Sequence, residues 1–376
     1  MFGNLWFYYF AVFFCAMLVS LFCTPAFINI AQRYRIVDKP GPRRVNVKVT
    51  ARFGGPAMFL GFAVASAFVM RRIPEWPAVI TGAGLMAFIG GFDDVRGLPA
   101  PVKLAGQILV AALVTALGVR VDFVTNPFDK SMFFLPNWLT FTITIFWIVG
   151  ITNTVNLIDG LDGLAAGIVC IASFTFFLVA DFRGQESSAM LSLALMGSTV
   201  GFLRWNFFPS KTFMGDAGAY FLGFMVSVIA VGGTFKSTTA VTFLIPVLAL
   251  GVPIFDTTFA ILRRLRKGGS VMSAPDKGHV HHRLLRMVEK GRSEFVHAGE
   301  EDGPKFLLWL LQWRPHRTVV ILVYVITLCL SVVSLLLIRA YPYAIALLVG
   351  IILLVPLMII TGKLVKGRRH AKNKSM

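Results

Sequence analysis

Residues 138–180 read WLTFTITIFWIVGITNTVNLIDGLDGLAAGIVCIASFTFFLVA. Two apolar runs, 138–154 and 164–180, flank a short polar segment in this stretch. Each run has about the 17–25 residues that a helix needs to cross the hydrocarbon core of a bilayer. The stretch therefore predicts two membrane-spanning helices joined by a polar connection.

The composition extends this pattern to the whole chain of 376 residues. Hydrophobic residues make up 56% of it and charged residues 14%, whereas soluble domains average roughly 45–50% and 25%. This excess excludes a disordered chain and an ordinary soluble protein. The cysteines, which all lie within apolar runs, indicate packing residues rather than a disulfide framework.

Apolar runs of spanning length recur eleven times along the chain. They lie at 5–31, 53–70, 76–92, 101–118, 138–154, 164–180, 188–206, 217–235, 239–261, 317–338 and 342–361. The fold class expected is an all-α, polytopic integral membrane protein of about 11 transmembrane helices, forming a single transmembrane domain over residues 1–376. A long loop, 262–317, and a basic tail, 362–376, are the polar additions.

The basic residues are distributed unequally between the two sides of the membrane. Loops after odd-numbered spans hold 29 of the 36 Lys and Arg residues, and the remaining loops hold 7. Because basic loops stay in the cytoplasm, the N-terminus is expected outside the cell membrane and the tail inside. Topology thus explains the net charge of +18, and no nucleic-acid partner is expected. The first span lacks a basic leader and a cleavage site, so we expect it to be retained.

Acidic residues gather on the predicted cytoplasmic side, which is informative because intramembrane charge is costly. The segment GGFDDVRGLPAPVK, residues 90–103, contains Asp93 and Asp94 at the end of a span and Lys103 at the start of the next. Adjacent carboxylates repel, so they indicate a shared cation, a retained proton or a fully solvated helix end. A solvated helix end alone would make this pair structural.

The segment NTVNLIDGLDGLAAG, residues 153–167, is the most polar connection between two spans. Its amides and acids are Asn153, Asn156, Asp159 and Asp162. On one continuous helix this spacing would carry them to opposite faces. The interspersed glycines favour an unwound turn that gathers oxygen atoms around one point, as Mg²⁺ requires. The alternative is an Asx-rich turn without a ligand.

Two further segments supply polar groups on the same side. Asp216 lies between glycines in NFFPSKTFMGDAGAYFLGF, residues 206–224, where it is either a helix cap or a metal ligand. The loop segment APDKGHVHHRLL, residues 274–285, contains Asp276, His279, His281, His282 and Arg283. Asp276, His279 and His282 share a helix face, so a zinc site is conceivable, but the neighbouring basic residues suit a polyphosphate better.

Oxygen ligands for a hard cation beside a rim of His, Lys and Arg indicate phosphoryl transfer at the membrane surface. A secondary transporter is the main alternative, although its ionisable residues are expected near the bilayer midplane on broken helices. A membrane zinc hydrolase built on the histidine loop is another.

Five segments in this order resemble the polyprenyl-phosphate N-acetylhexosamine-1-phosphate transferase superfamily. They are DDVRGLPAPVKLAGQ, NTVNLIDGLDGLAAG, NFFPSKTFMGDAGAYFLGF, VPIFDT and PDKGHVHHRLL. The form of the histidine motif is more similar to the branch of undecaprenyl-phosphate N-acetylglucosaminyl-1-phosphate transferases than to the muramoyl-pentapeptide branch. The resemblance covers residues 33–291.

The resemblance implies an eleven-span fold with a cytoplasmic active-site cleft. The implied reaction transfers a sugar 1-phosphate from a UDP-N-acetylhexosamine to undecaprenyl or another polyprenyl phosphate and releases UMP. The donor could be UDP-GlcNAc, another UDP-N-acetylhexosamine or UDP-MurNAc-pentapeptide. Mg²⁺ is the implied cofactor, with Mn²⁺ as an alternative, and the implied partners are the two substrates, the bilayer and, as an open alternative, a second copy in a homodimer.

The resemblance also implies roles for individual residues. Asp93 and Asp94 match the paired aspartates near the lipid phosphate, and Asn156 and Asp216 match the magnesium ligands. Asp159 and Asp162 match acids at the catalytic and nucleotide ends of the cleft. The expected substrate-binding residues are Lys103, Asn153, Asp276, His279, His281, His282 and Arg283.

Two segments depart from the family pattern. The first cytoplasmic loop lacks the usual His and Pro residues, so only Arg52 is weakly matched there. Residues 292–316 match no family pattern. The mixed-charge, Gly-containing stretch KGRSEFVHAGEEDGPK, residues 290–305, is expected to form a flexible insertion.

Overall fold

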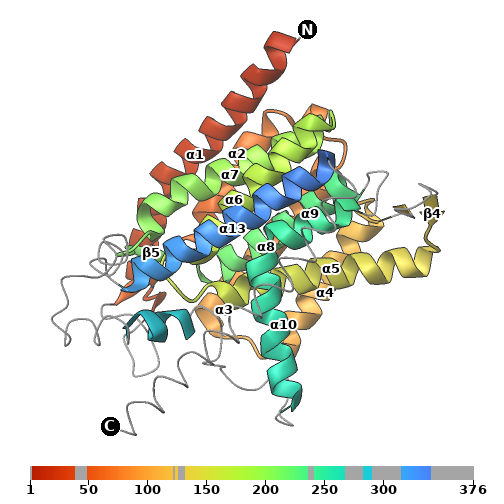
Figure 1. Ribbon diagram of the computed structural model, residues 1–376. Coiled ribbons are helices and arrows are strands. Elements are labelled where there is room, and N and C mark those ends of the chain that lie inside the picture. The colour runs from red at the N-terminus through yellow and green to blue at the C-terminus, as the bar shows by residue number, and fades with distance from the viewer. Residues whose placement is uncertain are drawn as a thin grey trace, which may run out of the picture.

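The computed structural model describes residues 2–38, 49–121, 123–125, 132–235, 241–266, 283–289 and 315–339. The chain is helical through most of these ranges (Figure 1). The helices are α1 Phe2–Arg33, α2 Gly55–Ala67, α3 Trp76–Arg96, α4 Ala100–Ala116, α5 Asn137–Ile158, α6 Leu164–Phe182, α7 Glu186–Asn206, α8 Gly215–Ile229, α9 Val241–Ala249, α10 Gly251–Arg266 and α13 Pro315–Arg339, with a short helix at 283–289.

Six helical segments among the described residues are long and apolar enough to cross a membrane: α1, α3, α5, α6, α13, and α8 together with its continuation to Gly232. The helices α2 and α4 are apolar but shorter. The first eight expected spans and the tenth each coincide with a described helix, so the multi-pass membrane architecture is confirmed. The eleventh expected span, 342–361, the tail and most of the loop 262–317 lie outside the described residues.

The ninth expected span, 239–261, is wrong as a single helix. It consists of α9 and α10, which run in different directions (Figure 1). Pro253 is the third residue of α10 and has no N–H to donate to the carbonyl of Ala249, the last residue of α9. The break therefore follows from a proline that the apolar pattern concealed.

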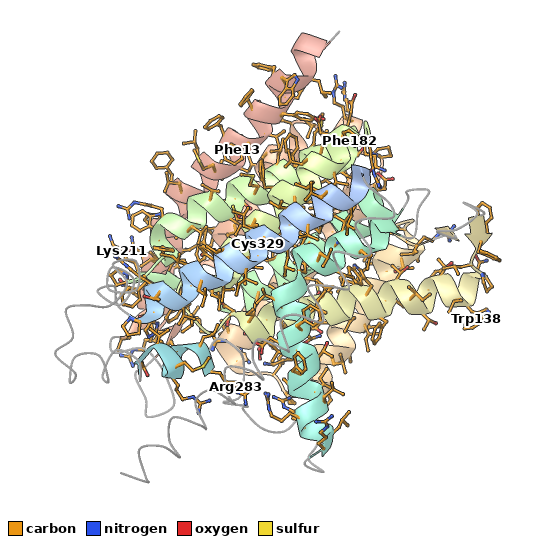
Figure 2. All side chains as sticks on the ribbon, in the orientation of Figure 1. Phe13, Trp138, Phe182, Lys211, Arg283 and Cys329 are labelled. Carbon is orange, nitrogen blue, oxygen red and sulfur yellow. The ribbon has the colours of Figure 1, made fainter. Side chains whose placement is uncertain are left out.

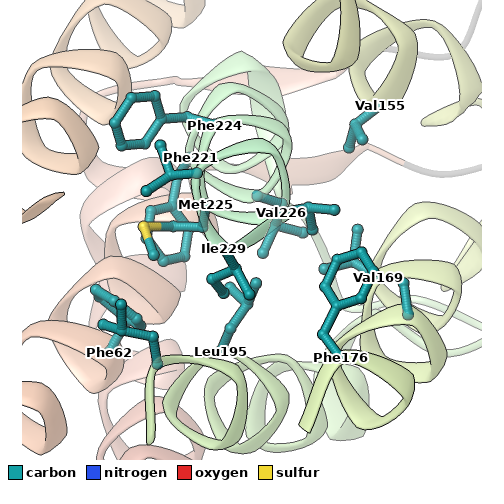
Figure 3. Close-up of a cluster of buried hydrophobic side chains, with 14 of the residues drawn as sticks. Phe62, Val155, Val169, Phe176, Leu195, Phe221, Phe224, Met225, Val226 and Ile229 are labelled. Carbon is teal, nitrogen blue, oxygen red and sulfur yellow. The ribbon is translucent and has the colours of Figure 1, made fainter. Parts of the chain in front are cut away.

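The helix α8 forms the centre of the bundle. Every residue from Ala217 to Ile229 is buried, and α8 packs against both α3 and α5. Phe221 lies edge-on to Phe62 of α2 with ring centroids 5.7 Å apart (Figure 3). Since lipid is as apolar as these side chains, close packing rather than exclusion of water holds such helices together.

Glycines let the helices approach closely near the site. A Cβ on Gly90 of α3 would lie 2.3 Å from the backbone oxygen of Asp216, and one on Gly55 of α2 would lie 2.2 Å from the nitrogen of Gly218. Side chains at either glycine would push α8 away from its neighbours. The N-terminus of α8 is thereby fixed against the end of α3.

A small three-stranded sheet, which was not predicted, lies beside this helix end. Its strands are β1 Val37–Asp38, β2 Thr50–Arg52 and β5 Thr212–Phe213, in the order β1, β2, β5. The pairing of β2 with β5 is parallel and places Arg52 opposite Phe213. This pairing brings the first loop to the N-terminus of α8. The other described strands, β3 Phe123–Thr125 and β4 Met132–Phe134, form a separate hairpin.

Candidate active site at the ends of α3, α5 and α8

Asp94 connects the last turns of α3 to the N-terminus of α8. Its side chain is fully buried and accepts hydrogen bonds from the backbone nitrogens of Asp216 at 2.9 Å and Ala217 at 3.0 Å. A carboxylate at this place satisfies N–H groups that have no partner within their own helix. Gly215, the residue before Asp216, has φ +68°, and a Cβ at Gly215 would lie 2.3 Å from Oδ2 of Asp94. Glycine is therefore required at position 215.

Asp216 is the point where four segments of the chain meet. Its Oδ1 accepts hydrogen bonds from Nη2 of Arg52 at 2.9 Å and Nδ2 of Asn156 at 3.1 Å. Its Oδ2 contacts Nζ of Lys103 at 3.4 Å. Thus β2, α4 and α5 each contribute a side chain that contacts the one carboxylate of α8.

Asp93 and Asp94 have separate partners although they are adjacent. Asp93 forms an ion pair with Lys103 and accepts a hydrogen bond from the backbone nitrogen of Leu98 at 2.6 Å. Asp94 instead forms an ion pair with Nε of Arg52 at 3.2 Å. The repulsion between these two aspartates is therefore offset by two different cations, and Asp216 contacts both cations.

Asn156 contacts the carboxylate cluster, whereas Asn153 has other partners. The side chain of Asn153 donates to Oε1 of Gln107 at 2.6 Å and to the backbone oxygen of Val149 at 2.8 Å. Both asparagines are still helical, since α5 continues to Ile158. Their three-residue spacing places them about 60° apart around the helix axis, so Asn153 faces α4 and Asn156 faces α8.

The expected unwound turn occupies residues 159–163, between α5 and α6. Gly163 has φ +78° and allows the chain to enter α6. Asp159 lies in this turn, where burial raises its pKa to about 7; Arg52 lowers that pKa, and Asp216 and Asp94 raise it. Asp159 is thus electrostatically part of the carboxylate cluster.

Asp162 lies at the other end of this turn and organises neighbouring backbone. Its Oδ2 accepts a hydrogen bond from the nitrogen of Ser210 at 3.0 Å. The backbone nitrogen of Gly163 donates to Oδ1 of Asn206 at 3.0 Å, and the backbone oxygen of Gly163 accepts from the hydroxyl of Tyr324 at 2.5 Å. The turn is therefore tied to α7 and α13.

Asp276, His279, His281 and His282 lie outside the described residues. Arg283 is exposed on the helix 283–289 (Figure 2), whose Leu285 is buried in the core. Its expected contact with substrate stays a prediction.

The donor set around Asp216 suits a hard cation that keeps some of its water. Among the described residues, no three His, Cys, Asp or Glu side chains are grouped as metal ligands. Asp216 and Asn156 nevertheless place a carboxylate and an amide together, and Mg²⁺ is commonly held by one or two carboxylates plus substrate phosphates and water. The residues therefore fit Mg²⁺, and they do not fit a closed zinc site within the described ranges.

Sequence reasoning matched Arg52 only weakly to the site and missed Gln107, the partner of Asn153. Arg52 contacts two of the acids, and Gln107 is fully buried in α4 beside Asn153. A buried glutamine in an apolar helix was a usable signal, because such residues need a polar partner. The contacts of Arg52 depend on strand pairing, which two- and three-residue strands do not reveal in a sequence.

Comparison with known proteins identifies the family. Residues 76–234, which include the acids of the site and Lys103, match the model of glycosyl transferase family 4. A probable undecaprenyl-phosphate N-acetylglucosaminyl 1-phosphate transferase of Bacillus subtilis (strain 168) is 43% identical over 275 residues, which cover 73% of this chain and 76% of that protein.

Two other relatives extend the comparison to more distant bacteria. A decaprenyl-phosphate N-acetylglucosaminephosphotransferase of Mycolicibacterium smegmatis is 35% identical over 74% of this chain and 75% of its own length. An undecaprenyl-phosphate alpha-N-acetylglucosaminyl 1-phosphate transferase of Escherichia coli (strain K12) is 27% identical over 71% of this chain and 74% of its own length. The matched residues include the whole carboxylate cluster and its helices, and this multi-pass membrane protein belongs to glycosyl transferase family 4.

Proposed function

We propose that the protein transfers N-acetylglucosamine 1-phosphate from UDP-N-acetylglucosamine to undecaprenyl or another polyprenyl phosphate and releases UMP. The names of the relatives support both the transferred group and the lipid acceptor. The observation that carries the proposal is the meeting of Asp93, Asp94 and Asp216 with Arg52 and Lys103 at helix ends. Acids beside cationic side chains suit a reaction between two phosphate groups.

The reaction exchanges one phosphoanhydride for another. An oxygen of the lipid phosphate attacks the β-phosphorus of the UDP-sugar, and the bond from that phosphorus to the bridging oxygen breaks. UMP leaves with the bridging oxygen. Because bond types are conserved, the site mainly has to align the reactants and offset the charge that accumulates between two phosphates.

The residues divide these tasks between them. Asp93 is the better candidate to accept a proton from, or orient, the lipid phosphate, because both carboxylate oxygens of Asp94 accept hydrogen bonds from the N-terminus of α8. Lys103 and Arg52 lie beside Asp93 and Asp216 and would contact phosphate oxygens of the substrates. Asp159 and Asp162 would border the sugar and nucleotide ends, and His279, His281, His282, Arg283 and Asp276 would close over the diphosphate.

Asn156 and Asp216 would hold Mg²⁺, or Mn²⁺ in its place. A bound divalent cation would neutralise charge on the diphosphate oxygens during transfer. Asn153 would then support α5 against α4 rather than contact substrate, as its bonds to Gln107 and Val149 suggest.

We further propose the topology that the basic loops predict. The protein would lie in the cell membrane with eleven spans, its N-terminus outside and the tail 362–376 inside. The carboxylate cluster would then face the cytoplasm, where UDP-sugars are made. The loop 262–317 would bring the histidines to the cluster from the same side.

The test is turnover by the full chain purified in detergent with Mg²⁺ and undecaprenyl phosphate. A panel of UDP-sugars is supplied, and UMP is measured alongside the lipid-linked product. UMP and product with UDP-N-acetylglucosamine are expected. UMP only with another UDP-N-acetylhexosamine or with UDP-MurNAc-pentapeptide would correct the donor, and no UMP from folded protein with any donor would reject the reaction.

A further inference from the structure

Both carboxylate oxygens of Asp216 contact cationic side chains. Nη2 of Arg52 lies 2.9 Å from Oδ1, and Nζ of Lys103 lies 3.4 Å from Oδ2. Each cation also binds one aspartate of α3: Arg52 binds Asp94 and Lys103 binds Asp93. The two cations therefore bridge α3 and α8 on two sides of the same carboxylate.

The two cationic side chains are more exposed than the acids that they hold. The side chains of Arg52 and Lys103 are 37% and 27% exposed, whereas those of Asp94, Asp93 and Asp216 are 0%, 3% and 15% exposed. A divalent cation that binds Asp216 would have to displace the guanidinium and the ammonium from its oxygens. The two kinds of cation would compete for the same oxygens.

A nucleoside diphosphate changes this competition. Its oxygens are an alternative partner for both side chains, and a guanidinium binds phosphate oxygens in a bidentate manner as well as it binds carboxylates. Once Arg52 and Lys103 contact the diphosphate, Asp216 is released to a divalent cation. The exposure of both side chains leaves them room to make this move.

We propose that Arg52 and Lys103 are internal counter-ions that keep the affinity of Asp216 for a free divalent cation low until a nucleoside diphosphate draws them away. The diphosphate as the trigger rests on the proposed function. Divalent-cation and nucleotide binding are then positively coupled, and by linkage each ligand strengthens binding of the other. Arg52 is a positioning residue here, because it acts on the metal through Asp216.

The charges determine whether a substitution at Arg52 strengthens or weakens the binding of each ligand. Replacing Arg52 with glutamine removes one positive charge beside a metal-ligand oxygen, so a divalent cation alone binds more tightly. At the dielectric constant of water, one positive charge beside the bound metal ion changes the affinity for a doubly charged ion roughly tenfold. The same substitution removes a phosphate contact, so UDP alone binds more weakly. A merely structural defect would weaken both.

The experiment uses the full chain in detergent without lipid substrate. Mn²⁺ binding is titrated by the EPR signal of the free ion, and UDP binding is measured separately by calorimetry in EDTA. Arg52→Gln is compared with wild type, with Arg52→Lys, which keeps the charge, and with Arg204→Gln, which removes an exposed arginine at the end of α7. Asp216→Asn reports which Mn²⁺ ions bind at this site.

The expected result for Arg52→Gln is roughly tenfold tighter Mn²⁺ binding together with weaker UDP binding, while Arg204→Gln stays near wild type in both measurements and Arg52→Lys stays near wild type in Mn²⁺ binding. Mn²⁺ binding that is unchanged or weaker in Arg52→Gln, or absent from every variant, overturns the proposal. Should Arg52→Gln not fold, Lys103→Gln takes its place with the same two expectations. Failure of UDP to bind wild type would count against the proposed function instead, while the Mn²⁺ comparison still decides the role of the counter-ions.

Discussion

The two ends of the site are held together by different kinds of interaction. Around Asp216 the contacts are ion pairs to Arg52 and Lys103, whose side chains are partly exposed. Around Gly163 they are hydrogen bonds between neutral groups, from Gly163 to Asn206 and from Tyr324 to Gly163. Charged contacts can be exchanged for those of an ionic ligand, whereas neutral bonds to backbone fix a conformation. We therefore expect the end around Asp216 to rearrange when ligands bind and the end around Gly163 to keep its conformation.

Asp216→Asn should have the largest effect at the charged end. The change preserves volume but removes the carboxylate that meets Arg52, Lys103 and Asn156, so turnover should fall by about 10²–10³-fold while the protein still inserts and folds. Thermal unfolding in detergent controls for folding, and UMP release measures turnover. Turnover near wild type would remove Asp216 from the set of metal ligands.

Asn156→Ala and Asn153→Ala separate a site residue from a supporting one. Loss of the Asn156 amide next to Asp216 should raise the Mg²⁺ concentration needed for half-maximal turnover by roughly 10–100-fold, as the loss of groups around metal ligands commonly does. Asn153→Ala should leave this Mg²⁺ requirement unchanged and lower thermal stability, because its partners are Gln107 and Val149. A shifted Mg²⁺ requirement in Asn153→Ala would mean that Asn153 belongs to the substrate-binding residues.

Gly215→Ala tests the cap that joins α3 to α8. Its φ of +68° disfavours any Cβ by about 1–2 kcal/mol, and this Cβ would also lie 2.3 Å from Asp94. Gly184→Ala is the matched control, since Gly184 has φ +67° and nothing within 4 Å of its Cβ position. Thermal unfolding should show the larger loss of stability for Gly215→Ala. Equal losses would mean that the side chain of Asp94 moves away from the new Cβ at no cost in stability.

Tyr324→Phe should have the smallest effect, at the neutral end. It removes the hydrogen bond to the oxygen of Gly163 and costs about 0.5–1.5 kcal/mol, with a modest rise in KM for the UDP-sugar and no change in Mg²⁺ requirement. Steady-state kinetics at several Mg²⁺ concentrations provide the measurement. A changed Mg²⁺ requirement would show that the two ends of the site are coupled.

Much of the site could be predicted because each acid lies at a place where its helix must end. The glycines that follow Asp159 and precede Asp216 mark these ends, and a charge in an apolar chain is tolerated there. The split of Asp93 and Asp94 between two cations could not be predicted, because it depends on the register of β2 against β5 and on the position of α4. Asn153 was assigned to substrate because spacing alone does not say which neighbour a helix face meets.

Hydropathy, charge asymmetry and the order of the motifs were enough to establish a multi-pass membrane protein of this family, since these properties depend on composition and local spacing. Tertiary structure decided which polar groups touch: Arg52 meets Asp216 from a distant loop, and Asn153 meets Gln107 of α4. Long-range contacts of this kind arise from packing and strand pairing, and their energies depend on both partners at once. A sequence lists the partners singly, so only the folded chain shows which cation holds which carboxylate.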